Sequence, residues 1–599
     1  LDRAAQTLCY VLSNRIIFYE AIRVRQPGLP KLAIPPRIAD GEAAYKHFQR
    51  RFQQAVEATG DYEPLFHPQE QKDWAGPLIF RSPGALDAWR AVLRSVEGYN
   101  LRTVPHDVVG KIFQRLISPE ERHKFGQHFT HEDVVDVINA FCIRRPDAVV
   151  LDPSCGSGSF LVRAYHRKAW LSEQPSAAPG EGRYHKSHQE LLQEIFGCDI
   201  ALFPAHLATL NLAARQIEKE ENYPLIARRN FFDVDRGQPF CQVPGARVGK
   251  HREMRDVPVP EFHAIVGNPP YVRQELIPRR DQRAPVSQTK EYLQQLVSDA
   301  WPGLELSGRS DLHCYFWPAA CRFLRDNGHF GFLTSSSWLD VEYGFPLQAW
   351  ILCHFKLIAI IESTDEPWFE AARVKTCATI LQRCRDEAKR MDNKVRFVRL
   401  KKPLAEILGE RPNGDESARQ RAADELRKLI EGTSKDYSDE NLRIIVKSQR
   451  DLWDEGVAAA RVIEGRKHAQ PEMVSDGHRQ RMSDYGGGKW GRYLRAPDFF
   501  FEIMREFGRQ FVKLGEIAEV RSGVRSGCDG FFMPHDVTQW ALSECPDPLS
   551  FKSRFGCRRD EVAACKLKIV KAGDGSVHPI ESEYLAPEVH SLMVIDRPV

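Results

Sequence analysis

The sequence lacks several features that would place it in a familiar class of protein. Its 14 cysteines include no Cys-x-x-Cys pair, which argues against a zinc ribbon or a dithiol redox motif. It has neither a signal peptide nor the apolar run of about 18 residues that a membrane span requires. Lys and Arg (84) nearly balance Asp and Glu (81), so bulk charge indicates no particular partner. These absences predict a cytoplasmic protein with reduced thiols and no membrane contact, in which any nucleic-acid surface is a local patch.

What the sequence does have is enough length and apolar content for several domains. The 599 residues, 42% hydrophobic and 28% charged, predict roughly three or four compact globular units. Residues 1–122 are predicted to form a helical N-terminal domain, because 8–23 and 84–99 place apolar residues three and four positions apart. The chain opens on Leu1 rather than Met, which suggests that it is part of a longer polypeptide.

Residues 123–400 have a different texture, in which short apolar runs alternate with helical stretches. This alternation predicts an α/β domain with a parallel, doubly wound, Rossmann-like sheet. Residues 401–510 are highly charged and predict a solvated helical linker or insert, and 511–599 predict the start of a separate domain. The predicted strands of the sheet cover 148–152, 194–200, 263–268, 328–334, 357–362 and 377–383.

A glycine loop follows the first predicted strand in 149-VVLDPSCGSGSFLVRAY-165. The strand ends on Asp152, and Gly156 and Gly158 let the backbone turn tightly and approach a ligand at the carboxyl end of the sheet. No Gly-Lys-Ser/Thr follows, which argues against a triphosphate-binding loop. The next strand also ends on an acid, Asp199, the position from which such folds bind ribose hydroxyls. The two acids favour a ligand site; the alternative is ordinary strand-to-helix turn chemistry.

A third strand ends in 262-FHAIVGNPPYVRQE-275, where two prolines and an aromatic residue follow Asn268. Prolines donate no N–H, so the Asn268 amide oxygen and the Pro269 carbonyl remain as acceptors at the edge of the sheet. Tyr271 adds a flat aromatic face. Two acceptors and a stacking ring suit a planar NH2 group whose lone pair is delocalised. The alternative is a proline-terminated strand with an aromatic plug.

Together, VVLDPSCGSGSF and GNPPY resemble the amino-methyltransferases that use S-adenosylmethionine. The order of the motifs resembles the gamma-class N6-adenine DNA methyltransferases of restriction-modification and phage-defence systems (type IIG, BREX or DISARM-like), over about 108–383. The resemblance implies a site-specific enzyme that transfers a methyl group to N6 of a flipped adenine in double-stranded DNA. It also implies restriction or phage-defence subunits as partners, and a target-recognition domain that begins in 511–599.

The resemblance implies roles for residues along the carboxyl edge of the sheet. Asn268, Pro269, Pro270 and Tyr271 form the catalytic segment. Tyr271 and Phe369 also stack on the target base, with Trp368 replacing Phe369 in an alignment shifted by one residue. The chain departs from the family at His131, where Pro usually follows Thr130, and the adenine-binding acid falls on Asn230 or on Asp233. The implied cofactor-binding residues are Thr130, Asp152, Ser154, Cys155, Gly156, Gly158, Asp199, Asn230 and Asp233.

Other functions remain as alternatives. His123, His128 and His131 lie close together, but no matching acid or cysteine set accompanies them, so no metal is predicted. The Asn-Pro-Pro-Tyr motif also serves methyltransferases that modify a protein glutamine, although those chains are far shorter. A non-catalytic DNA-recognition subunit that keeps the fold is a further alternative. No acid-acid-lysine nuclease centre is evident in 1–120, so methylation alone is predicted.

Overall fold

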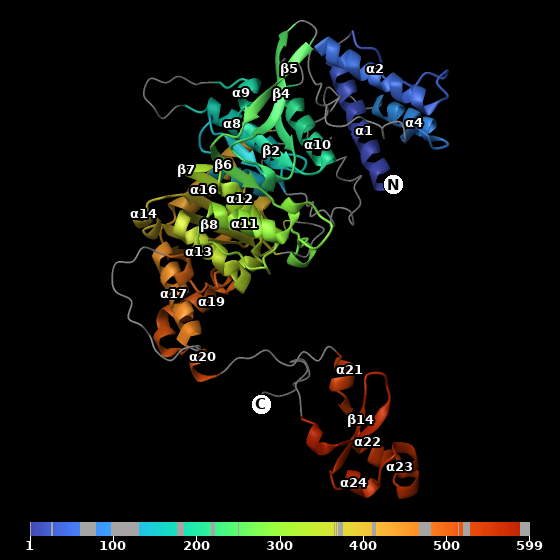
Figure 1. The fold of residues 1–599 in the computed structure, drawn as a ribbon. Helices are drawn as coiled ribbons and strands as arrows, with labels where there is room; N and C mark the ends of the chain where they lie inside the picture. The colour runs from blue at the N-terminus through green and yellow to red at the C-terminus, as the bar shows by residue number, and fades with distance from the viewer. Residues whose placement is uncertain are drawn as a thin grey trace. The chain divides into compact units, whose positions relative to one another are not determined.

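The computed structural model describes most of the chain. The chain divides into two compact units, residues 1–497 and 498–599, and each is considered by itself (Figure 1). The sequence had suggested a last domain that begins at 511. The described residues are 2–25, 28–59, 79–97, 131–175, 185–216, 222–248, 251–364, 366, 368, 375–409, 415–465, 481–512, 514–518 and 528–586.

One ten-stranded sheet forms the centre of the first unit, in the order β11-β12-β10-β8-β9-β7-β6-β1-β2-β3. From β1 the chain adds β2 and β3 on one side and later β6 and β7 on the other, all in parallel. The order therefore reverses between β1 and β6, the topological switch point where α/β sheets bind ligands. The strands are β1 Val150–Asp152, β2 Ile195–Asp199, β3 Leu225–Arg228, β6 Phe262–Gly267, β7 Leu324–Ser335, β8 Phe355–Ser363, β9 Thr376–Arg383, β10 Lys394–Leu400, β11 Tyr437–Ser438 and β12 Leu442–Ser448.

All six predicted strands are present, and the Rossmann-like α/β fold is confirmed, but the sheet is mixed rather than wholly parallel. Strand β9 lies between β7 and β8 and runs antiparallel to both. Residues 364–375 connect β8 to β9, and neighbouring antiparallel strands can be joined directly without a crossover. The β8–β9 pair is therefore a hairpin-type unit inserted into the parallel sheet.

Helices cover both faces of the sheet (Figure 1). Side chains alternate along β7, so Gly331 and Phe332 face opposite sides. A Cβ at Gly331 would lie 2.6 Å from Sγ of Cys142 in α7, whereas the Phe332 ring centroid lies 6.2 Å from that of Trp317 in α12. The main helices of this unit beyond residue 130 are α7 Glu132–Cys142, α8 Ser159–Glu173, α9 His188–Leu192, α10 Leu202–Ala213, α11 Lys290–Ala300, α12 Leu312–Cys321, α13 Phe345–His354, α14 Glu387–Met391, α15 Leu404–Ile407, α16 Glu416–Gly432, α17 Gln449–Gly465 and α18 Gly491–Arg495.

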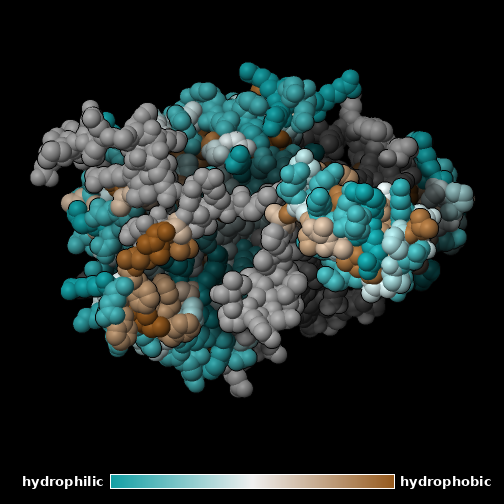
Figure 2. Space-filling view, turned by 90° about the horizontal axis from the view of Figure 1, so that it is seen from below, coloured by the Kyte–Doolittle hydropathy of each residue, from teal (hydrophilic) through white to brown (hydrophobic). Residues whose placement is uncertain are grey.

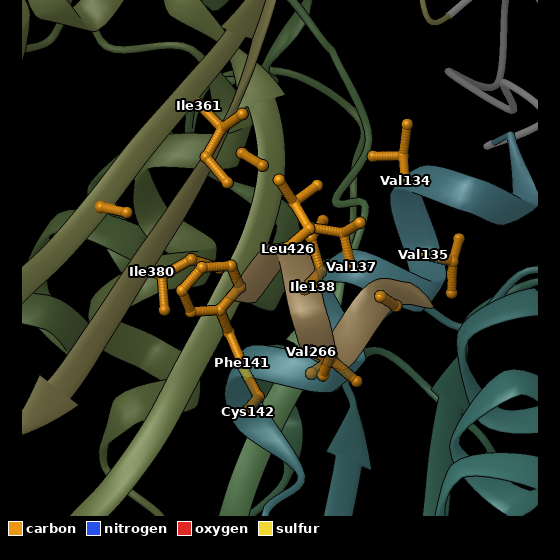
Figure 3. Close-up of a cluster of buried hydrophobic side chains, with 14 of the residues drawn as sticks. Val134, Val135, Val137, Ile138, Phe141, Cys142, Val266, Ile361, Ile380 and Leu426 are labelled. Carbon is orange, nitrogen blue, oxygen red and sulfur yellow. The ribbon is translucent and has the colours of Figure 1, made fainter. Parts of the chain in front are cut away.

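The segment expected to be a solvated linker is part of the core, which corrects that prediction. Strand β12 pairs antiparallel with β10, which itself pairs parallel with β8, so the sheet continues well past residue 400. Helix α16 lies against α7, and its Leu426 joins the same apolar cluster as Ile138 and Phe141 of α7 (Figure 3). Ala423 and Ile430 of α16 are fully buried in that cluster.

The charged residues of α16 do not make it an exposed helix, because several of them form buried ion pairs. Asp136 of α7 is fully buried and accepts hydrogen bonds from Arg163 at 2.6 Å and from Arg419 at 2.8 Å. Arg167 of α8 is likewise buried and donates to Asp424 at 2.6 Å. Removing one partner from such a pair strands a buried charge, which is costly. The network therefore fixes α16 against the two helices that precede and follow β1.

Residues 485–497 complete the other face of the sheet. Gln348 is fully buried; its amide nitrogen donates to the Gly488 carbonyl at 3.0 Å, and its amide oxygen accepts from Tyr485 Oη at 3.0 Å. Arg443 of β12 donates to the carbonyls of Leu494 and Ala496 at 2.9 and 2.7 Å, where the last carbonyls of α18 would otherwise lack donors.

The described residues before 98 form helices and have an apolar cluster of their own. Its helices are α1 Asp2–Arg25, α2 Gly41–Thr59 and α4 Ala85–Glu97. Leu210 and Ala213 of α10 belong to the same cluster as Tyr19, Phe48 and Phe52. The helical region therefore packs on the sheet domain through α10. A two-stranded antiparallel ribbon, β4 Pro239–Val248 and β5 His251–Pro258, lies between β3 and β6 in the sequence.

The second unit has a small core of its own around Ala541, Phe551 and Ile569. Helix α19, by contrast, leaves Phe499, Phe507 and other large apolar side chains exposed. Figure 2 shows apolar side chains gathered in patches on the face that it draws. The elements of this unit are α19 Asp498–Phe507, α20 Leu514–Ile517, α21 Asp529–Phe532, β13 His535–Asp536, α22 Thr538–Glu544, α23 Pro548–Phe555, α24 Arg559–Ala563, β14 Leu567–Lys571 and β15 Val577–Glu581.

Two leucines on α16 test whether this helix is core or linker. Leu426→Ala removes a buried side chain and is expected to lower the free energy of unfolding by about 2–4 kcal/mol. Leu429→Ala, on the exposed side of the same helix, is expected to change it by less than about 0.5 kcal/mol. Urea denaturation measures both, and equal, small effects would contradict the packing of α16.

Candidate active site at the carboxyl edge of the sheet

The predicted site residues meet where β1, β2 and β6 end. In the parallel register Asp152 lies beside Gly197 of β2, and Leu151 lies beside Ile265 of β6. Asp152, Asp199 and Asn268 therefore leave three neighbouring strands at one edge. The middle strand of the three, β1, borders the switch point, so the sheet topology alone marks this edge as the place for a ligand.

Asp152 is in close contact with the strand that leads into the Asn-Pro-Pro-Tyr motif. A Cβ on Gly267 would lie 2.7 Å from Oδ1 of Asp152, which is closer than real Cβ contacts come. The same oxygen accepts a hydrogen bond from the Ser154 backbone N–H at 3.0 Å. The Ser154 hydroxyl is buried and has no hydrogen-bond partner among the described residues. Glycine at position 267 thus gives the carboxylate its place beside Asn268.

Asp199 closes the glycine loop onto the next strand. Its two carboxylate oxygens accept hydrogen bonds from the backbone N–H groups of Gly156 at 3.0 Å and of Ala201 at 2.8 Å. Gly158 has φ 85°, a left-handed conformation, and a Cβ there would lie 3.1 Å from Ala208 of α10. Gly156 is also left-handed, with φ 53°. Both glycines are therefore required by the backbone, and Asp199 holds the loop in place while each of its oxygens keeps a second lone pair.

Burial raises the pKa of both acids. The pKa of Asp152 rises from 3.8 to about 8, chiefly because burial penalises the charged form, with a smaller contribution from the nearby negative charge of Asp199. Burial also raises the pKa of Asp199 to about 6, opposed by the two backbone N–H groups that it accepts from. A cationic group bound beside Asp152 would supply the countercharge that the carboxylate lacks.

Cys155 faces the interior. Its thiol belongs to a buried apolar cluster with Leu161, and burial raises its pKa. Its backbone N–H donates to the Cys198 carbonyl at 2.9 Å. Only the backbone of Cys155 is therefore placed to line a ligand site. The cofactor-binding role suggested for this residue is thus limited to its backbone groups.

The Asn-Pro-Pro-Tyr segment begins directly after β6. Asn268 and Pro270 are half-buried and Pro269 is buried. The Tyr271 hydroxyl donates to the Leu333 carbonyl of β7 at 3.1 Å, and its ring meets His313 of α12 edge-on, with centroids 6.2 Å apart. This hydrogen bond and this aromatic contact help to hold the ring in place. His313 is buried, which lowers its pKa to about 4, so it packs there as a neutral ring.

Asn230 and Asp233, the two candidates for binding the cofactor adenine, both form hydrogen bonds with Ser287. Nothing in the sequence marks Ser287 as part of the site. The Asn230 amide nitrogen donates to the Ser287 carbonyl and hydroxyl oxygen, each at 3.2 Å. The Ser287 hydroxyl donates to Asp233 at 3.1 Å. Asn230 is half-buried two residues beyond β3, whereas Asp233 is exposed. Asn230 therefore lies nearer the edge at which β1, β2 and β3 end.

Two predicted site residues, Thr130 and Phe369, lie outside the described residues. Trp368 is described: it is 6% exposed, and its indole N–H donates to Glu366 at 3.3 Å. Trp368 belongs to the apolar cluster that contains α7 and α16, so it is a core residue. The described residues contain no group of three His, Cys, Asp or Glu side chains that could hold a metal ion. Among them no helix is both long and apolar enough to cross a bilayer.

Similarity to known proteins falls on the same segment. Residues 193–369, which run from β2 through the Asn-Pro-Pro-Tyr motif to Phe369, match the family model described as Eco57I restriction-modification methylase. The chain resembles restriction-modification methyltransferases. This confirms the resemblance that the sequence indicated, over the part of the first unit that carries Asp199 and Asn268.

Curated relatives carry related names. The type II methyltransferase M.PaeR7I of Pseudomonas aeruginosa is 24% identical over 41% of this chain and 38% of its own length. The type II methyltransferase M.XhoI of Xanthomonas vasicola is 29% identical over 23% of each chain. The alignments thus span well under half the length of these relatives. Among solved structures, the type IIG restriction endonuclease BpuSI aligns with 84% of this chain and 51% of its own, at 13% identity and a TM-score of 0.46.

A glycine exchange tests the contact between β6 and Asp152. Gly267→Ala is expected to displace the Asp152 carboxylate and to weaken S-adenosylmethionine binding at least tenfold, because its Cβ would lie 2.7 Å from Oδ1. Gly237→Ala, where nothing lies within 4 Å of the added Cβ, is expected to leave binding unchanged. Calorimetric titration measures both, and normal binding by Gly267→Ala would contradict the contact.

The raised pKa of Asp152 predicts how stability varies with pH in the cofactor-free protein. Because the folded pKa is about 8 and the ordinary value is 3.8, this group's contribution to stability is full below pH 3.8 and is lost as the pH rises through about 8. Asp152→Asn stays neutral, so its melting temperature should fall less than that of the wild type between pH 5 and pH 8.5. The exposed Asp281→Asn should follow the wild type. Parallel wild-type and Asp152→Asn curves would contradict this assignment.

Proposed function

We propose that the protein is a site-specific DNA methyltransferase that transfers a methyl group from S-adenosylmethionine to N6 of an adenine extruded from double-stranded DNA. The observation that carries the proposal is the position of Asn268, at the switch point of the sheet and one residue beyond the contact between Gly267 and Asp152. The similarity of 193–369 to restriction-modification methylases supports the same reaction class.

The residues at this edge fit S-adenosylmethionine. Burial raises the pKa of Asp152, so a nearby positive charge would stabilise its carboxylate form. The buried Ser154 hydroxyl has no hydrogen-bond partner among the described residues. These two groups suit the ammonium and carboxylate of the amino-acid moiety. Asp199 suits the ribose hydroxyls, and Asn230 suits the adenine amine through its amide oxygen. When bound, the cofactor supplies an electrophilic methyl group on a positively charged sulfur.

Asn268 and Pro269 act on the amine of the target. The Asn268 amide oxygen and the Pro269 carbonyl each accept one N6 hydrogen, which holds the nitrogen lone pair toward the methyl group. Both acceptors would favour the positive charge that develops on N6 as its bond to the methyl carbon forms and the methyl–sulfur bond breaks, which would leave the sulfur as a neutral thioether. Pro270 fixes its own φ near −65° directly after the Pro269 carbonyl and adds no N–H donor to the site. The extra proton on N6 then leaves to solvent, and no strong general base is required.

Tyr271 supports the extruded base. Extrusion costs a few kcal/mol of stacking and pairing, and stacking on an aromatic ring returns roughly 1–3 kcal/mol per base. The hydrogen bond from Tyr271 to Leu333 and the edge contact with His313 keep the ring in one orientation. Phe369 is proposed as the second face of this sandwich. A ring that is already ordered loses little entropy when the base arrives.

The names of the similar proteins support a proposal for the biological role. Type II methyltransferases such as M.PaeR7I share part of this chain, so we propose that the enzyme marks host DNA in a restriction-modification or phage-defence system, together with separate restriction or defence subunits. The second unit is proposed as the start of the target-recognition domain.

An exchange at Asn268 tests the catalytic assignment. Asn268→Ala is expected to reduce methyl transfer roughly 100- to 1,000-fold or more, because a charge-stabilising acceptor is removed, while S-adenosylmethionine still binds. Asn268→Asp keeps one acceptor oxygen and is expected to retain part of the activity. Tritium transfer from labelled cofactor measures the rate, and calorimetry measures binding. Near-normal turnover by Asn268→Ala would overturn the assignment.

The identity of the molecule that accepts the methyl group is tested with the wild-type protein. Labelled methyl groups are expected in unmethylated duplex DNA, and digestion of the product is expected to give N6-methyladenosine. Label in protein glutamine instead would favour the glutamine methyltransferase alternative. DNA binding without methylation of any DNA would favour a non-catalytic recognition subunit. Sequencing the modified DNA gives the methylated site.

A further inference from the structure

The segment that follows the catalytic motif, residues 272–290, forms a loop with a rigid base. Its two ends are joined by Lys290, which is 6% exposed. The Lys290 ammonium group donates to the Gln274 backbone carbonyl at 2.9 Å, to the Gln274 amide oxygen at 3.1 Å and to the Gly308 carbonyl at 2.8 Å. A buried ammonium group with three oxygen acceptors fixes the position of Gln274, three residues beyond Tyr271.

Asp311 holds the same point from the other side. It accepts a hydrogen bond from the Gln274 backbone N–H at 3.0 Å and another from the Tyr343 hydroxyl at 3.4 Å. The backbone N–H of Leu312 donates to the Val272 carbonyl at 3.0 Å. Both backbone groups of Gln274 are thus satisfied by side chains of other elements. The loop leaves the catalytic segment at a fixed point.

The far side of the loop is attached to the cofactor edge. Ser287, in the 3-10 turn Val286–Gln288, makes the contacts with Asn230 and Asp233 described above. The loop therefore has anchors beside both substrate positions of the proposed reaction. Most of the residues between these anchors are exposed to solvent.

The exposed middle of the loop carries an unusual combination of side chains. Leu276 is 71% exposed, the highest value for a large apolar side chain in the described part of residues 1–497. It ends the 3-10 turn that Gln274 begins, so it projects from the rigid base of the loop. Exposed arginines flank it in the sequence, and they outnumber the two acids of the same stretch, Glu275 and Asp281. The exposed arginines are Arg273, Arg279, Arg280 and Arg283.

We propose that residues 273–283 are the surface that grips duplex DNA beside the extruded base: the arginines bind backbone phosphates, and Leu276 enters the base stack where the adenine leaves. This inference rests on the proposed function and names the part of the chain that opens the duplex. Guanidinium groups bind phosphate oxygens in pairs of hydrogen bonds. Apolar side chains inserted between base steps keep a duplex open in other DNA-bending proteins.

The position of the surface decides between DNA and other anionic partners. A phosphate surface far from Asn268 would serve any polyanion, but this one begins two residues after Tyr271, the ring proposed to receive the base. Phosphates of the extruded nucleotide and its neighbours must pass beside that ring. An apolar side chain that is exposed to water on a loop lowers solubility. Leu276 would lose that exposure if it were inserted between stacked bases.

The phosphate part is tested by the salt dependence of binding to a random-sequence duplex. Each arginine that no longer binds a phosphate is expected to reduce the slope of log K against log[salt] by about 1, so Arg279→Gln with Arg283→Gln should reduce it by about 2. The matched control is Arg385→Gln with Arg450→Gln. Both control arginines are exposed and follow β9 and β12, which end at the opposite edge of the sheet. Equal slopes for the two double variants would overturn the phosphate contacts.

The insertion of Leu276 into the base stack is tested by comparing methylation rates on two duplexes that carry the site mapped by sequencing modified DNA. In one the target adenine is paired, and in the other it is mismatched. Leu276→Ser is expected to lower kcat/KM at least tenfold on the paired duplex and less than threefold on the mismatch, because a mismatched base is already easier to extrude. Leu429→Ser, on α16, is expected to change neither value. An equal reduction on both duplexes, or no reduction on either, would overturn the role of Leu276.

These experiments separate failure of the inference from failure of the proposed function. If the wild type methylates no DNA, the proposed function fails, while the salt slope still reports whether this surface binds phosphates. If the wild type methylates adenine but both the double arginine variant and Leu276→Ser behave like their controls, the function stands and the surface assignment is wrong.

Discussion

The close approach of β6 to the Asp152 carboxylate is the constraint on which the site depends. Strands β1 and β6 are neighbours only because the strand order reverses between them, and that reversal leaves a crevice at their carboxyl ends. Gly267 has no side chain, so the carboxylate can occupy the space where a Cβ would lie. The Asp152 carboxylate and the Asn268 amide, 116 positions apart in the sequence, thereby become neighbours. The positions of Asp199 and the glycine loop follow from the register of β2 on β1.

The sequence predicted the features that are encoded locally. Six strands are apolar runs that end in turn or polar residues, and Asp152, Asp199 and Asn268 stand at the ends of three of them, so both the sheet and its functional edge could be inferred. The antiparallel direction of β9 was not predicted, because apolar content does not encode direction. Ser287 was missed for a related reason: a serine in a polar loop gives no sign of the distant residues that it will contact.

The charged region after residue 400 shows a different limit of sequence reasoning. A helix with mixed acids and bases usually lies in solvent, but the pattern does not reveal which charges have buried partners elsewhere. In α16 those partners are Asp136, Arg163 and Arg167, which lie on the helices around the glycine loop. Loss of one partner from such a buried pair leaves an uncompensated charge, so the pairs depend on one another. The helices around the glycine loop are therefore supported by a helix from another part of the chain.

The ion pair between α8 and α16 also has a consequence for folding during synthesis. Asp424 lies 257 residues after Arg167, and the ribosome adds roughly 5–20 residues per second, so Arg167 is without this partner for roughly 13–50 seconds. During that interval the guanidinium group cannot be buried without great cost, so α8 docks fully only after α16 has emerged. The crevice at the carboxyl edge of the sheet, although encoded early in the chain, therefore matures late. A nascent chain in this state would expose apolar strand faces, which makes it a natural client for chaperones.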